Sequence, residues 1–162
     1  MNRALRKFLD AYAFKGAPYP TSADLVALLR AEAPADKQQL ITDLFDKITL
    51  YDLRASRARV ARRPDGRFDV AVTVVARKLY ADGRGKEVEA PLSEAIDIGV
   101  FDAEPGKKAF SKRNVLALQR QVLHSGEQTV VVTVDHPPRF AGVDPYNKLI
   151  DRNSNDNVIR TD

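Results

Sequence analysis

The chain has 162 residues, with 26 Lys and Arg against 22 Asp and Glu, two His and no Cys. Hydrophobic residues make up 44% and charged residues 30%, which is typical of a globular chain of one domain or two small units. The lack of Cys excludes disulfides, thiolate nucleophiles and Cys-ligated zinc. No run approaches the roughly 18 apolar residues of a membrane span, and no signal peptide follows Met1. We therefore expect a soluble chain without membrane contact of its own.

The net charge of +4 is spread over the length of the chain. The basic stretches 54–67 and 107–113 contain almost no aromatic residues, although surfaces that bind single-stranded nucleic acid usually do. This pattern favours solvated strand and loop surface and predicts no nucleic-acid partner. A weaker alternative is a nucleic-acid binder with steep salt dependence, which would use Arg57, Arg59, Arg62, Arg63, Lys107, Lys108, Lys112 and Arg113.

Residues 1–52 show the 3.6-residue period of short amphipathic helices. A stop at Gly16 and Pro18 follows the first helix, a capping box with Asp in place of Glu at Thr21–Asp24 begins the second, and Pro34 ends it. The spacing predicts three helices with one apolar stripe each. The stripes are Leu5, Phe8, Leu9 and Tyr12; Leu25, Leu28 and Leu29; and Leu40, Ile41, Leu44, Phe45 and Ile48.

From about Arg54 the period becomes two, which is typical of half-buried strands. Strands are predicted around 68–74, 96–100, 116–122 and 130–134, separated by turn signals at 64–66, 82–85, 105–106 and 125–126. In the third of these, Leu116, Leu118 and Val122 are expected to share the apolar face, which Arg120 interrupts. The prediction is an α+β chain with an antiparallel, Ig-like β-sandwich over 53–143. Residues 144–162 are expected to form a polar tail that packs back only as far as Leu149 and Ile150.

The two histidines do not match a catalytic or metal-binding motif. A zinc site needs three or four convergent ligands, and no G-x-S-x-G elbow supports a Ser–His–Asp triad. We interpret His124 and His136 as surface or strand-end residues. Asp43 and Asp46 are spaced to project together from the third helix, but on the side away from its apolar stripe, which favours a solvated face.

Two polar segments, 82–86 and 151–162, have some features of ion-binding loops. Residues 151–162 have the oxygen-ligand spacing of an EF-hand, but Asp156 stands where that loop needs glycine, which favours an Asn/Asp-rich turn. The Gly-rich loop Asp82–Lys86 has basic residues that could attract a phosphate, but it joins two strands and does not open a helix, so it lacks the geometry of an anion-binding site. The residues therefore predict no catalytic, cofactor or metal site in this chain.

Two segments resemble a known enzyme family. The strings Ala4–Phe14 and Pro20–Leu25 resemble the zinc aminopeptidases of the alanyl aminopeptidase and leukotriene hydrolase type. In that family such helices follow the HExxH zinc helix and the catalytic tyrosine, and a β-sandwich comes next. Residues 143–153 are similar to the sandwich terminus of large bacterial members, in which the peptidase-like region follows a multi-spanning permease-like segment.

The resemblance implies the C-terminal part of a bacterial integral membrane protein that hydrolyses N-terminal peptide bonds with zinc, with Met1 marking a truncation. The chain has no HExxH, no third glutamate ligand and no G-x-M-x-N, so no catalytic or zinc residue can be carried over. Zinc is expected only in the parent, and the expected partner is the rest of that polypeptide. The stripes of the first and third helices would contact it, or would self-associate. The alternative is a stand-alone, non-enzymatic interaction module with loops 82–87 and 104–112 as its tips.

Overall fold

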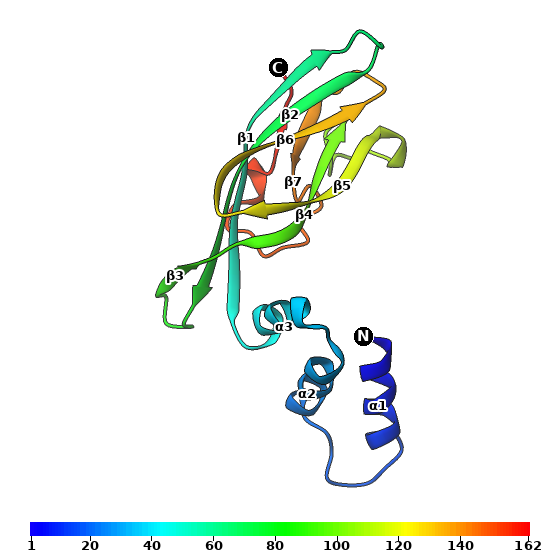
Figure 1. Cartoon of the computed structure of the whole chain (residues 1–162), viewed down its shortest axis with the longest axis vertical. Helices are drawn as coiled ribbons and strands as arrows, with labels where there is room; N and C mark the ends of the chain where they lie inside the picture. Colours follow the sequence, from blue (N-terminus) through cyan, green and yellow to red (C-terminus); the bar gives the residue numbers. More distant parts are fainter. The chain divides into compact units, whose positions relative to one another are not determined.

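The computed structural model describes all 162 residues and divides them into two units, Met1–Ile48 and Thr49–Asp162 (Figure 1). The first unit is helical, and the second consists of two antiparallel sheets packed together as an open sandwich. The predicted α+β class, with three helices before the sheets, is confirmed. No helix in the chain has both the length and the apolar character of a membrane-spanning segment.

The helical unit contains α1 (Asn2–Tyr12), α2 (Ser22–Glu32) and α3 (Gln38–Phe45). The predicted capping box is present: the Asp24 backbone N–H donates to Thr21 Oγ1, and the Asp24 carboxylate accepts from the Thr21 N–H at 2.7 Å. These bonds satisfy donors that the helix itself leaves unpaired. Arg3 of α1 bonds Glu32 of α2 at 2.8 Å, which ties the first two helices together.

The third helix is shorter than expected. It ends at Phe45, and Ile48 begins the first strand, so the assignment of Ile48 to the helical stripe is wrong. The strand also starts earlier than the predicted Arg54, because Tyr51 and Leu53 already alternate into the core. A β-branched pair, Ile48–Thr49, stands at this start and favours extended backbone over helix.

Strand β2 is the centre of the first sheet. It pairs with β1, with β6 from Phe68↔Val134 to Ala76↔Gly126, and with β3 from Lys78↔Ala90 to Ala81↔Glu87. The second sheet has the order β5-β4-β7-β8. The strands are β1 (Ile48–Arg62), β2 (Phe68–Ala81), β3 (Glu87–Ala90), β4 (Ser93–Phe101), β5 (Val115–His124), β6 (Gly126–Val134), β7 (Phe140–Val143) and β8 (Val158–Arg160).

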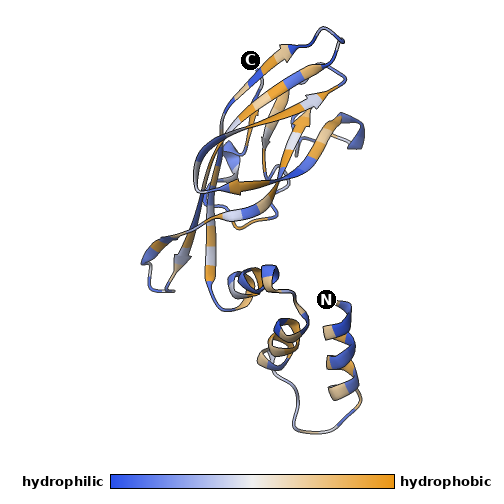
Figure 2. Cartoon of the chain, in the orientation of Figure 1, coloured by the Kyte–Doolittle hydropathy of each residue, from blue (hydrophilic) through white to orange (hydrophobic).

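The core lies between the two sheets and is built by the predicted alternation, which is visible along the strands in Figure 2. Val70, Val72 and Val74 of β2 are fully buried, and Ile98 and Val100 of β4 meet them from the other sheet. Strand β5 is an exception. Leu118 and Val122 are exposed together with Arg120, and Leu123 is the fully buried residue. The predicted apolar face is therefore wrong for Leu118 and Val122, which lie with Arg120 on the solvent side of this edge strand, whereas Leu116 is partly buried and packs against the core.

The C-terminal segment enters the fold beyond the expected limit at Ile150. Val158–Arg160 form the edge strand β8 against β7, and Asn157 is 1% exposed. The Asn157 carbonyl accepts from the Val143 N–H at 2.9 Å, and the Asp162 N–H donates to Ala58 of β1. This strand was not predicted because the segment is polar and its pairing depends on backbone groups. The strand can approach β7 closely because Gly142 has no side chain.

Candidate functional site

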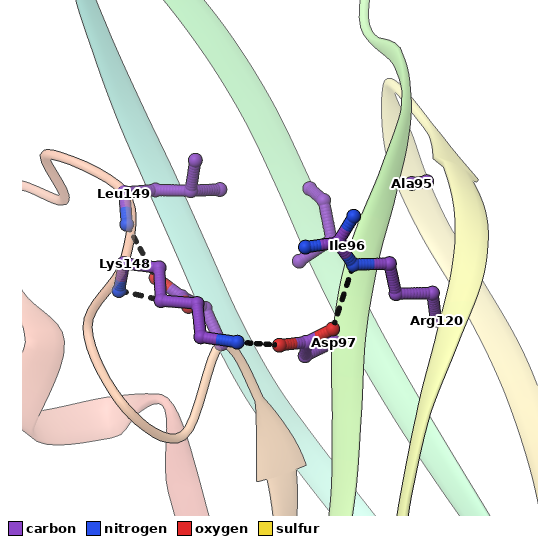
Figure 3. Close-up of a pocket in the computed structure, with 7 residues that line it drawn as sticks. Ala95, Ile96, Asp97, Arg120, Lys148 and Leu149 are labelled. Atoms are coloured by element: carbon purple, nitrogen blue, oxygen red, sulfur yellow. Dashed lines mark hydrogen bonds and ion pairs between the residues drawn. The ribbon is translucent and has the colours of Figure 1, made fainter. Parts of the chain in front are cut away.

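A small pocket in the sandwich surrounds Asp97 (Figure 3). Asp97 lies in β4 and is only 8% exposed, Arg120 reaches it from β5, and Lys148 reaches it from the segment after β7. The cavity holds about 60 Å³. Since each water in the liquid occupies about 30 Å³, this space suits one or two waters and not an organic substrate.

Asp97 is held in its charged form. Lys148 Nζ lies 2.6 Å from Asp97 Oδ2, and Arg120 Nε lies 3.2 Å from Oδ1. These contacts hold the pKa of the Asp97 carboxyl below its usual range, with the hydrogen bond from Lys148 as the largest cause. Both carboxylate oxygens are therefore engaged by cations from the neighbouring strand and from the loop.

Asp144 is buried close to Asp97, but the pKa of its carboxyl is shifted in the opposite direction. Burial raises the pKa of its carboxyl, and the negative charge of Asp97 adds to that effect. Its two oxygens accept the backbone N–H groups of Lys148 and Leu149 at 3.0 and 2.9 Å, and its own N–H donates to the Asp97 carbonyl.

Two carboxyls with opposite pKa shifts are a pattern of acid–base sites. Here, however, every oxygen of Asp97 and Asp144 already has a protein donor. The arrangement is suited to fastening the loop 144–149 to the second sheet. The contact between Asp97 and Lys148 was not predicted from the sequence, because 51 residues separate the two.

A second polar cluster joins the two sheets from within. Lys78 of β2 is 2% exposed and places its Nζ 2.7 Å from Glu94 Oε1 of β4. The Tyr51 hydroxyl of β1 donates to Glu94 Oε2 at 2.6 Å. A buried lysine needs such a partner, because a charge removed from water is costly unless it is paired. The signal was in the sequence: the alternation that buries Val74 and Ala76 also directs Lys78 inward.

The histidines and the helical aspartates do not come together. His124 ends β5 and His136 lies between β6 and β7, both exposed, and no three His, Cys, Asp or Glu residues are grouped to hold a metal. Asp46 is exposed and pairs with Arg30 of α2. Asp43 is only 7% exposed and accepts from Gln39 at 2.9 Å, so the interpretation of this pair as a solvated face is wrong for Asp43.

In the loop 82–86 and in the tail 151–162, the polar groups hydrogen-bond to groups of the same segment. Asp82 accepts the N–H groups of Arg84 and Lys86 at 2.8 and 3.1 Å, so its own carboxylate occupies the amides that a phosphate would need. In the tail, Asp151 Oδ1 accepts from Asn153, and a short 3-10 turn spans Ser154–Asp156. The tail is therefore a set of turns followed by β8.

No protein-family model, curated protein or solved structure matches this chain.

Proposed function

We propose that this chain works as a non-catalytic packing and interaction module whose helical unit docks on another polypeptide surface. The main support for this proposal is the exposed apolar side of α3. Leu40, Leu44 and Phe45 are 48%, 65% and 51% exposed. Leu40 and Leu44 are one helical turn apart, so they form an exposed apolar stripe on one side of the helix, and Phe45 is exposed at its last position. Such a stripe on a soluble domain usually marks an interaction site.

A groove beside this stripe supports the same proposal. It holds about 410 Å³ between α2 and α3, and its lining includes Val26, Ala27 and Phe45, with Arg30 and Asp46 at the polar side. The volume lies in the range of pockets that accept a bulky group, and the mixed lining suits apolar side chains beside a polar backbone. On α1, Leu9 is a further exposed apolar residue at 59%.

The resemblance supports a particular partner for this surface. It would be the catalytic domain of a zinc aminopeptidase, a bacterial membrane protein of which this chain forms the C-terminal region. In that arrangement the helices complete the peptidase domain, the sandwich follows it, and zinc belongs to the parent alone. The second candidate, a stand-alone interaction module, uses the same exposed stripe with a different partner.

Dye binding and size-exclusion chromatography test the docking surface. The whole chain is expected to bind an apolar dye and to elute in part as a dimer, because the stripe has no cover. The double variant Leu44→Gln/Phe45→Gln should lose both properties. The matched control Val122→Thr/Val131→Thr changes two residues that are 59% and 57% exposed on the sandwich, and it should keep them. A wild-type chain that is monomeric and dye-free would overturn the proposal.

The parent assignment has a separate test. The reading frame upstream of the Met1 codon should encode an HExxH helix and a third glutamate ligand if the chain comes from a zinc aminopeptidase. A stop codon and a ribosome-binding site there would remove that assignment. They would leave the docking surface of the helical unit in place, with a partner other than a peptidase domain.

A further inference from the structure

The outer face of the first sheet carries a row of arginines on β1. Tyr51, Leu53, Ala55 and Ala58 point into the core, so the residues between them point outward. Ser56 and Arg57 are both exposed between two buried alanines, so the alternation shifts by one residue there. As a result the β1 arginine row, defined as Arg54, Arg57 and Arg59, lies exposed on one face.

The arginines of this row have no acidic partner within the chain, whereas the neighbouring arginines do. At one end of the face, Arg77 is neutralised by Glu89 at 2.8 Å and Asp52 at 3.7 Å. At the other end, Arg63 pairs with Asp69 at 3.1 Å. The members of the β1 arginine row make no ion pair and no side-chain hydrogen bond within the chain. Each of these three exposed guanidinium groups therefore has N–H donors available to a partner.

The surface next to the row is flat and contains no aromatic side chain. Ala71 and Thr73 of β2 are paired with Val131 and Thr129 of β6, and the two threonine hydroxyls lie 3.1 Å apart. The acid on β6 of this face, Glu127, is opposite Val75 and so is separated from β1 by one whole strand. With strands about 4.8 Å apart, this places it roughly 10 Å from the row.

We propose that the β1 arginine row is a docking surface for an acidic segment of a partner protein. Guanidinium groups bind carboxylates through two parallel hydrogen bonds. Arg57 and Arg59 are two residues apart on the strand and so are spaced by ~6.6 Å, which is also the repeat of alternate residues in an extended peptide. Single-stranded nucleic acid fits less well, because its bases need aromatic faces on which to stack and this surface offers small and β-branched residues. The site lies in the sandwich and does not depend on the helical unit.

Fluorescence anisotropy with a labelled decaglutamate peptide tests this surface on the whole chain in about 50 mM salt, where charge contacts are weakly screened. The variant Arg54→Gln/Arg57→Gln/Arg59→Gln should weaken binding about tenfold or more. The control Lys108→Gln/Lys112→Gln/Arg113→Gln removes the same charge from an exposed loop, and it should weaken binding less than about threefold. Replacing the row with lysines should give an intermediate loss, because the fork geometry is removed and the charge is kept.

Three results would overturn the proposal. One is a wild-type chain that does not bind decaglutamate under these conditions. Another is an equal loss in the two glutamine variants, which would mean that net charge alone is read. The third is a thymidine decanucleotide that binds more tightly than the peptide and depends on the same arginines, which would assign the surface to nucleic acid. Circular dichroism of each variant shows whether the sandwich is intact.

Discussion

Replacement of Gly142 by alanine tests whether the C-terminal strand belongs to the sandwich. Gly142 lies in β7, between Gly99 of β4 and Val158 of β8. A Cβ atom at this position would overlap the carbonyl oxygen of Asn157 and would lie 2.8 Å from Val158 Cα. Carbon atoms in contact usually stay about 3.5–4.0 Å apart, so β8 would have to move outward by roughly 1 Å.

The atoms that the new Cβ would meet belong to the backbone of Asn157 and Val158 and cannot rotate away, so the expected loss of stability is large. The shift would break or lengthen the bond from the Val143 N–H to Asn157, together with the pairing of Gly142 with Val158. Two or three backbone hydrogen bonds at about 1 kcal/mol each give a loss of roughly 3 kcal/mol in the free energy of unfolding. For the sandwich unit, Thr49–Asp162, that corresponds to a fall in Tm of roughly 12 °C.

Urea and thermal unfolding followed by circular dichroism measure this change. The control is Gly16→Ala, whose Cβ would meet no atom within 4 Å and needs no positive φ. It should stay within about 0.5 kcal/mol of the wild type. If Gly142→Ala also stays within that range, β8 does not lie against β7 as described, and the reasoning about the C-terminal segment is refuted.

Two further predictions concern the other polar features. Asp97→Asn should cost about 1 kcal/mol at pH 7, a modest loss because Lys148 and Arg120 are more than half exposed. Since the pKa of Asp97 is lowered in the folded state, this difference is present above about pH 4 and disappears as the pH falls below it. The variant also removes the negative charge that helps to raise the pKa of Asp144, while burial continues to raise that pKa in both proteins. A pH-independent difference in urea unfolding would contradict the ion pairs. Thr21→Ala should lower the folding equilibrium of α2 about fivefold, seen as lost helical signal at low denaturant, while Thr21→Ser should restore it.

The strands were predictable where one face is buried and the other is not. In β2 and β6 the valines alternate with polar or small residues, and the structure buries the face that the pattern indicated. On β5 the same method was wrong for Leu118 and Val122, because apolar residues stand on both sides of this strand and their spacing does not show which side faces the core. Local signals such as the Thr21–Asp24 box were reliable, because the interacting groups are three residues apart.

The polar clusters around Asp97 and Lys78 could not be predicted from the sequence for a different reason. The inward direction of Lys78 follows from its position in β2, but its partner Glu94 comes from the opposite sheet. Which strands face one another is decided by strand order, and periodicity carries no information about it. The same holds for Asp97 and Lys148, which meet only because the loop after β7 folds back over β4.

The pairing of β1 with the end of the chain has a consequence for synthesis on the ribosome. Tyr51 bonds residues 150 and 152, and Ala58 and Val60 bond Asp162, about a hundred residues later. The helices can form as soon as they emerge, but this edge of β1 has no partner until residue 162 has left the ribosome. During that interval a long strand with unpaired backbone groups is open to other chains. Slow translation of the last third would therefore prolong the time for which this strand edge is exposed to aggregation.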